Sequence, residues 1–177
     1  WLSDRAWAAA GKAKSPRYYF DLRIERKSQK ENTTAWTPAI SLVSGLKVAL
    51  DMMQEEGLEN MFERHARLAR GARAAMGALG LEIFPKDLMS EAVTVVCVPE
   101  GIDGKAIPRM MQENQGVTIA GGQSGLSGEI FRIGHLGYVD ESDILVAVGG
   151  VEATLACLGY SLGKGAGLAA AQEVFGK

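Results

Sequence analysis

The 177-residue sequence has few of the side chains that bind transition metals, with only two cysteines and two histidines. These four residues are scattered along the chain, so none has the spacing of a metal site. Cys97 and Cys157 lie in the apolar strings Val-Val-Cys-Val and Leu-Ala-Cys-Leu. We expect both to be small buried side chains in a reducing compartment.

Long apolar runs and an excess of charge are also lacking. The most apolar stretch, 144–163, is interrupted by Glu152 and by three glycines, so we do not expect it to span a membrane. Residues 1–20 mix charged and aromatic residues and do not resemble a signal peptide. The net charge of −2 has none of the basic excess of nucleic-acid-binding proteins. We therefore expect a soluble, cytoplasmic protein with no membrane or nucleic-acid partner.

The basic residues that are present include four arginines at helical spacing. Glu59 and Glu63 lie on the same segment, which favours a solvent-exposed helix face over an anion-binding patch. The four arginines are Arg64, Arg67, Arg70 and Arg73.

One arginine, Arg132, stands inside a short apolar run that follows a glycine-rich loop. Side chains alternate along a strand, so Arg132 is expected on one face, with Phe131, Ile133 and His135 on the other. A guanidinium on an apolar strand needs an anionic partner, and its planar fork suits a carboxylate. The residues alone leave three possibilities open: a ligand carboxylate, an internal pair with Asp or Glu, or a solvent-exposed edge strand.

The first half of the chain is dominated by helical patterns. Thr37 and Pro38 predict a helix start, with a hydroxyl at the N-cap and proline at the first helical position. Gly57 divides the long helical stretch in two, and Gly80 ends it. Apolar residues recur at helical spacing in both halves. They are Ala39, Val43, Leu46, Leu50 and Met53, then Leu58, Met61, Phe62, His65, Leu68, Ala72, Ala75, Met76 and Leu79.

The second half alternates short strands with helices. Runs rich in valine and isoleucine predict strands at 81–84, 93–98, 117–119 and 130–133, with a helix starting near Asp103. Asp140 is expected to cap a further helix, and the tail from Lys164 could form a loosely packed one. The predicted fold is α+β, a small antiparallel sheet covered by helices and preceded by a two-part helical stretch. The predicted divisions are an arm (1–36), connecting helices (37–80), an α+β domain (81–160) and a Gly/Ala-rich tail (161–177).

Several motifs occur in an order that resembles a known family. They are Asn-Thr-Thr-Ala-Trp-Thr-Pro-Ala-Ile (32–40), Gly-Leu-Glu-Asn (57–60), Ala-Gly-Gly (120–122) and Phe-Arg-Ile-Gly-His-Leu-Gly (131–137). Over residues 3–160 the chain resembles the C-terminal part of the class V aminotransferases, in the alanine–glyoxylate and serine–glyoxylate group. The resemblance implies pyridoxal phosphate as cofactor, a homodimer with active sites at the subunit interface, and amino transfer from alanine or serine to glyoxylate or a similar 2-oxo acid.

The resemblance also implies roles for individual residues. Arg132 matches the arginine that binds the substrate carboxylate, and Gly121 and Gly122 match the segment that lines the substrate pocket. Thr33, with Asn32 beside it, matches a position that reaches the cofactor phosphate of the neighbouring subunit. Thr37 is a further candidate for that contact, in competition with helix capping.

One part of the family pattern is absent from the chain. The lysine that forms the Schiff base lies upstream of the segment that matches Trp1, and Lys12 and Lys14 are poor substitutes. We therefore expect a fragment that supplies the carboxylate-binding arginine and no catalytic residue of its own. His135 and His65 are expected to have structural roles. The alternatives are a non-catalytic amino-acid-binding α+β module and a structural remnant in which Arg132 is paired internally.

Overall fold

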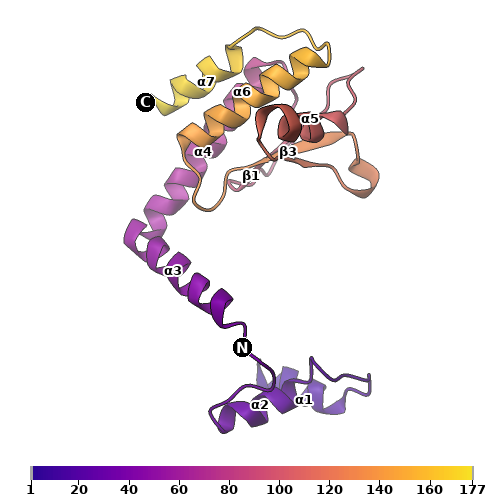
Figure 1. The fold of residues 1–177 in the computed structure, drawn as a ribbon, viewed down its shortest axis with the longest axis vertical. Coiled ribbons are helices and arrows are strands. Elements are labelled where there is room, and N and C mark those ends of the chain that lie inside the picture. Colours follow the sequence, from indigo (N-terminus) through magenta and orange to yellow (C-terminus); the bar gives the residue numbers. More distant parts are fainter. Residues whose placement is uncertain (1, 177) are drawn as a thin grey trace. The chain divides into compact units, whose positions relative to one another are not determined.

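A computed structural model describes residues 2–176, which divide into two compact units (Figure 1). The first unit ends at Glu55 and the second begins at Glu56, and each is described by itself. No helix within residues 2–176 combines the length and the hydropathy needed to cross a membrane.

The N-terminal unit consists of helices. Helix α1 spans Asp4–Lys12, α2 spans Leu22–Lys30, and α3 spans Ile40–Glu56, whose last residue belongs to the second unit. Arg26 of α2 lies over the ring of Trp7 of α1, 4.6 Å from its centroid. Such a cation–π contact ties the two short helices together.

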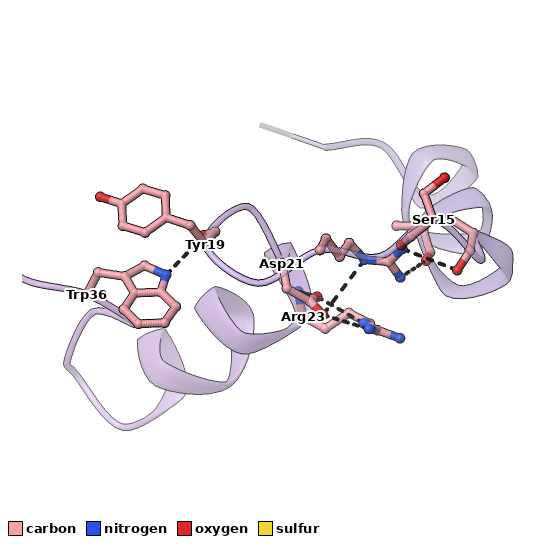
Figure 2. Close-up of polar contacts among 8 residues, drawn as sticks. Ser15, Tyr19, Asp21, Arg23 and Trp36 are labelled. Atoms are coloured by element: carbon pink, nitrogen blue, oxygen red, sulfur yellow. Dashed lines mark hydrogen bonds and ion pairs between the residues drawn. The ribbon is translucent and has the colours of Figure 1, made fainter.

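Asp21 holds the start of α2 in place (Figure 2). Its Oδ1 accepts hydrogen bonds from the backbone N–H of Arg23 and from Arg23 Nε, both at 3.0 Å. Arg23 Nη2 lies 2.6 Å from Asp21 Oδ2. These hydrogen bonds from Arg23 lower the pKa of the Asp21 carboxyl to about 2. Nearby, Trp36 Nε1 donates to the carbonyl of Tyr19 at 3.0 Å and the two rings stack.

The start predicted for the third helix is wrong. Helix α3 begins at Ile40, and the carbonyl of Ala39 accepts the backbone N–H of Val43, so Thr37 does not cap it. A tight turn, in which the N–H of Ile40 donates to the carbonyl of Pro38 at 2.9 Å, separates Thr37 from the helix. The helix then ends before Gly57, which has φ of 85°, as the sequence predicts.

The C-terminal unit is the predicted α+β arrangement. Its sheet has three antiparallel strands in the order β1-β3-β2, with β3 in the centre. Helices α4, α6 and α7 pack against one another, and α5 packs against α6 (Figure 1). The elements are α4 (Leu58–Ala78), β1 (Val93–Cys97), α5 (Ala106–Gln115), β2 (Ala120–Gly121), the 3-10 turn η1 (Ser124–Leu126), β3 (Ile130–Gly134), α6 (Glu141–Cys157) and α7 (Ala166–Phe175).

Two of the predicted strands differ from the structure. The run 81–84 contributes only an isolated bridge between Ile83 and Val96, and the strand expected at 117–119 lies at Ala120–Gly121 instead. In the latter case the apolar residues Val117 and Ile119 pack against the core from the loop that precedes the strand. Burial and strand pairing are therefore separated by a few residues, which a pattern of apolar side chains does not reveal.

The helix ends of this unit follow the predicted signals closely. Gly80 adopts φ of 73° and closes α4, with the N–H of Leu81 donating to Met76 O and that of Gly80 to Gly77 O. At the start of α6, Asp140 accepts the N–H of Asp143 while the Asp143 side chain accepts the N–H of Asp140. This reciprocal pair is a capping box.

The tail is packed tightly, in contrast to the loose packing that its composition suggests. A Cβ added to Gly71 of α4 would lie 2.3 Å from the ring of Phe175 in α7, so the glycine makes room for that ring. The Glu152 carboxylate, which is buried, accepts the N–H groups of Gly165 at 2.8 Å and Leu168 at 3.1 Å. Arg67 Nη2 also donates to the carbonyl of Phe175. Helix α7 is thus an integral part of the unit.

Two further expectations are corrected. Cys157 is exposed rather than buried, because α6 ends there and its side chain lies away from the buried stripe. The helix face of basic residues is only partly solvent-exposed, since Arg64 pairs with Glu56 at 2.6 Å and donates to the carbonyls of Gly137 and Val139.

Candidate functional site

Arg132 lies in the middle of β3, and the apolar run around it predicts this strand. Because β3 is the central strand of the sheet, the alternative of an edge strand is wrong. Arg132 is opposite Val95 of β1 and Ala120 of β2, and its side chain is half-buried. Phe131 and Ile133, on either side of it, are buried. The alternation therefore places the arginine on the opposite face of the strand from Phe131 and Ile133, which point into the core.

The Arg132 guanidinium is held by a backbone carbonyl. Nε and Nη2 both donate to the carbonyl oxygen of Gly121, at 3.1 and 2.9 Å. Within residues 56–176 no carboxylate lies within ion-pair distance of Arg132, so the alternative of an internal acidic partner finds no support in this unit. The Nη1 group and the second hydrogen of Nη2 are left without a bond in that part of the chain.

The glycine-rich loop that precedes β3, residues 121–128, requires glycine at position 122 for steric reasons. A Cβ there would lie 1.8 Å from the carbonyl oxygen of Leu126 and 2.9 Å from Ile130 Cγ1, whereas one on Gly121 would meet only Pro108, at 3.5 Å. Gly104 plays a similar part, since its Cβ would lie 2.0 Å from the carbonyl oxygen of Gly128. The loop can fold back on itself only because these positions are glycine.

The candidate cofactor residues belong to the N-terminal unit. Asn32 has φ of 56° and follows the end of α2. Its N–H donates to Gln29 O and that of Thr33 to Ser28 O, which is the Schellman arrangement of a helix end. Asn32 therefore has a structural reason for its identity. Thr33 and Thr37 are exposed, whereas the hydroxyl of Thr34 is already bonded to Trp36 O at 2.6 Å.

His135 has the environment of a structural residue. It is fully buried; its Nδ1 donates to the carbonyl of Glu91 at 3.0 Å and its Nε2 accepts from the Thr94 hydroxyl at 2.9 Å. A carbonyl can only accept, which assigns the proton to Nδ1. Burial lowers the pKa of His135, so the neutral ring is favoured. It lies on the opposite face of the sheet from Arg132.

His65 ties helix α4 to the loop after β3. Its Nδ1 donates to the carbonyl of Met61 at 2.7 Å, and its Nε2 accepts the backbone N–H of Gly137 at 3.0 Å. These two hydrogen bonds connect the helix to the loop, and the helical stripe of apolar residues does not predict them. In residues 2–176 no group of three His, Cys, Asp or Glu side chains is placed to hold a metal ion.

The comparisons with known proteins bear on this arrangement. No protein-family model matches the chain. The chain is 45% identical to the soluble hydrogenase small subunit of Synechococcus sp., over 98% of this chain and 45% of that protein. It is 40% identical to the serine–glyoxylate aminotransferase of Arabidopsis thaliana, over 96% of this chain and 43% of that protein.

A solved structure matches as well. The ureidoglycine–glyoxylate aminotransferase of Bacillus subtilis aligns with a TM-score of 0.89 and 30% identity, over 98% of this chain and 46% of that one. The chain matches a C-terminal part of the class V pyridoxal-phosphate aminotransferases. The chain spans about half the length of the curated relatives it matches. Its α+β unit has the fold of the C-terminal domain of these aminotransferases.

The extent of the match corrects one expectation. The motifs predict a resemblance that ends near residue 160, yet the aligned regions cover 98% of the chain in both the Synechococcus protein and the solved structure. Most of α7 therefore lies within the part shared with relatives, in agreement with its tight packing on α4. The sequence does not predict the contact between Arg132 and the Gly121 carbonyl, because every residue type has a backbone carbonyl and none identifies it as an acceptor.

Proposed function

We propose that this chain is the C-terminal domain of a pyridoxal-phosphate transaminase that transfers an amino group from a small amino acid, such as alanine or serine, to a 2-oxo acid such as glyoxylate. The observation that carries the proposal is the guanidinium edge of Arg132 that makes no hydrogen bond or ion pair within residues 56–176. The names of the relatives alone do not determine the activity, because one relative is named a hydrogenase subunit and others are named aminotransferases. A free arginine fork favours a carboxylate substrate.

Arg132 would bind the α-carboxylate of the amino acid and of the 2-oxo acid in turn. The guanidinium keeps its charge at any working pH and offers paired N–H donors to the two carboxylate oxygens. Gly121 places no side chain beside the guanidinium, and Gly122 allows the close turn of the loop against Leu126. The substrate would thus be oriented by its carboxylate, with the reacting carbon held at a fixed distance from Arg132.

The cofactor, when bound, supplies the electron sink for amino transfer. The chemistry of the donors fits its phosphate, because Thr33 and Thr37 are exposed and neither hydroxyl bonds to another residue between 2 and 55. We assign phosphate binding to Thr33, with Asn32 shaping the turn beside it and Thr37 as a second donor. We assign no proton transfer to this chain: every lysine within residues 2–176 is exposed, and the cofactor-binding lysine would come from another part of the protein.

We also propose that the protein acts as a homodimer. Helix α3 has no buried residue in this chain, and its apolar side chains include Ile40 at 68% and Leu42 at 74% exposure. A surface of this kind is typical of an association site. Light scattering of the purified protein at several concentrations tests this proposal, and a monomer at all of them would contradict it.

The test of the function uses the natural polypeptide that contains these 177 residues, loaded with pyridoxal phosphate. Arg132→Ala should lower kcat/KM for glyoxylate with alanine or serine as donor about 10- to 100-fold, mainly through KM, because a charge-assisted pair contributes about 1.5–3 kcal/mol. Arg109→Ala, which removes an exposed arginine of α5, is the matched control and should change little.

Two outcomes would contradict the proposal. If Arg132→Ala left KM for the 2-oxo acid unchanged, Arg132 would not be the carboxylate ligand. If the wild-type protein bound alanine through Arg132 but transferred no amino group, the non-catalytic binding module would be the better description.

A further inference from the structure

The contact between Arg132 and Gly121 limits how the arginine can meet a ligand. The Nε and Nη2 hydrogens form one edge of the guanidinium, and both are directed at the Gly121 carbonyl oxygen, at 3.1 and 2.9 Å. The opposite edge, formed by Nη1 and the second hydrogen of Nη2, makes no hydrogen bond or ion pair within residues 56–176. The plane of the fork is therefore set by a protein group before any ligand arrives.

The carbonyl that sets this plane is itself held on both sides. Gly121 is paired with Phe131 of the central strand, and the N–H of Gly122 donates to the carbonyl of Ile130 at 3.0 Å. On its other side the chain turns so sharply that a Cβ on Gly122 would lie 1.8 Å from Leu126 O. A side chain at position 122 must therefore displace the backbone that carries the Gly121 oxygen.

We propose that Gly121 is a positioning residue, acting through its backbone carbonyl, and that Gly122 keeps this carbonyl in place. The inference rests on the proposed role of Arg132 and adds to it the mode of recognition. The carbonyl occupies the Nε edge, so a substrate carboxylate is bound end-on, by Nη1 and Nη2. A carboxylate that needed the Nε edge would have to displace the Gly121 oxygen.

The free Nη1–Nη2 edge also suits one chemical class of ligand. Two parallel N–H groups match the two oxygens of one free carboxylate, whereas an ester or an amino alcohol offers no such pair. The site should therefore select amino and 2-oxo acids with an unmodified carboxylate, and this selection should depend on Gly122 as well as on Arg132.

The experiment compares four variants of the cofactor-loaded natural polypeptide. Gly122→Ala should raise KM for glyoxylate about tenfold, equivalent to 1.4 kcal/mol, with a smaller change in kcat. Gly125→Ala, in the same loop, is the control, because a Cβ there would meet nothing within 4 Å. In the Arg132→Ala background, adding Gly122→Ala should change KM less than twofold, because the loop acts through the arginine. Turnover of alanine methyl ester relative to alanine should rise in Gly122→Ala.

The outcomes separate this inference from the proposed function. If Arg132→Ala leaves KM for glyoxylate unchanged, the proposed function fails and the inference fails with it. If Arg132→Ala raises KM but Gly122→Ala does not, or if the two effects multiply independently, only the positioning role is refuted.

If Gly122→Ala does not fold, NMR of the arginine side chain in the wild-type protein tests the inference instead. The Arg132 Nε–H resonance should be protected from solvent exchange without ligand and should shift little when glyoxylate is added, while the Nη resonances shift. A large change at Nε–H on titration would show that the carboxylate takes the edge now bonded to Gly121, and would overturn the inference.

Discussion

Glu152 allows a quantitative test of how the C-terminal helix is held. The carboxylate of this α6 residue is only 7% exposed and accepts the N–H groups of Gly165 and Leu168, at the start of α7. The N-cap position of α7 itself is Gly165, which has no side chain to satisfy these donors. Glu152, a residue of the neighbouring helix α6, thus accepts the N–H groups that a local capping side chain would otherwise accept.

Two substitutions at this position should have graded effects. Glu152→Ala leaves both N–H groups without their acceptor, and each hydrogen bond to a charged group contributes about 1.5–3 kcal/mol. Both donors are only half-buried, so water replaces part of the loss, and we expect the free energy of unfolding to fall by about 2–3 kcal/mol. Glu152→Gln keeps the shape and one acceptor oxygen but turns an NH2 group towards the second N–H, and should cost about 1–2 kcal/mol.

The assay is urea denaturation followed by circular dichroism, with amide hydrogen exchange as a local readout. Glu152→Ala should lower the midpoint by about 1 M at an m-value of about 2–3 kcal/mol/M, and α7 amides should lose more protection than those of β3. The control is Glu113→Ala, on the exposed side of α5, which should stay within about 0.5 kcal/mol of wild type. A loss in Glu152→Ala no larger than in this control would refute the reasoning.

Two other predictions concern the core of the unit. Gly71→Ala should destabilise the protein by about 1–3 kcal/mol, because its Cβ would overlap the Phe175 ring, and Tm should fall by about 2–4 °C per kcal/mol. Gly77→Ala in the same helix meets nothing within 4 Å and should be neutral or stabilising. The lowered pKa of buried His135 means that the unfolded state binds more protons around pH 6.5, so the free energy of unfolding should rise with pH through that region and fall below it. Denaturation at pH 5.5 and 7.5 should show a smaller difference in His135→Gln than in wild type, and an equal difference would contradict the assignment.

The parts of the fold that the sequence predicts well depend on local chemistry. Gly57 and Gly80 end helices because they adopt positive φ, and Asp140 starts one because its carboxylate accepts a nearby N–H. The face on which Arg132 lies follows from strand alternation alone. These signals act over a few residues, so they can be recognised without knowledge of the tertiary structure.

The parts that it predicts poorly depend on distant contacts. Glu152 interrupts an apolar stretch in the sequence, yet its carboxylate is buried because α7 returns to it with two N–H groups. The tail is rich in small residues, which suggested loose packing, but Gly71 in α4 accommodates the Phe175 ring. Thr37 is a residue type that often caps helices, but the turn at Pro38 separates it from the start of α3, so it does not cap the helix. In each case the deciding partner is a residue or bond that the local pattern does not contain.

The bond between Arg132 and Gly121 also determines when conformational entropy is lost. A long arginine side chain that is mobile before binding loses about 0.5–1.5 kcal/mol of rotamer freedom when a ligand immobilises it. Here the side chain is already anchored by two hydrogen bonds on the central strand of the sheet, so the loss falls on folding rather than on binding. A small carboxylate, which can form few contacts of its own, gains most from such an arrangement, because almost none of its binding energy is spent on ordering the protein.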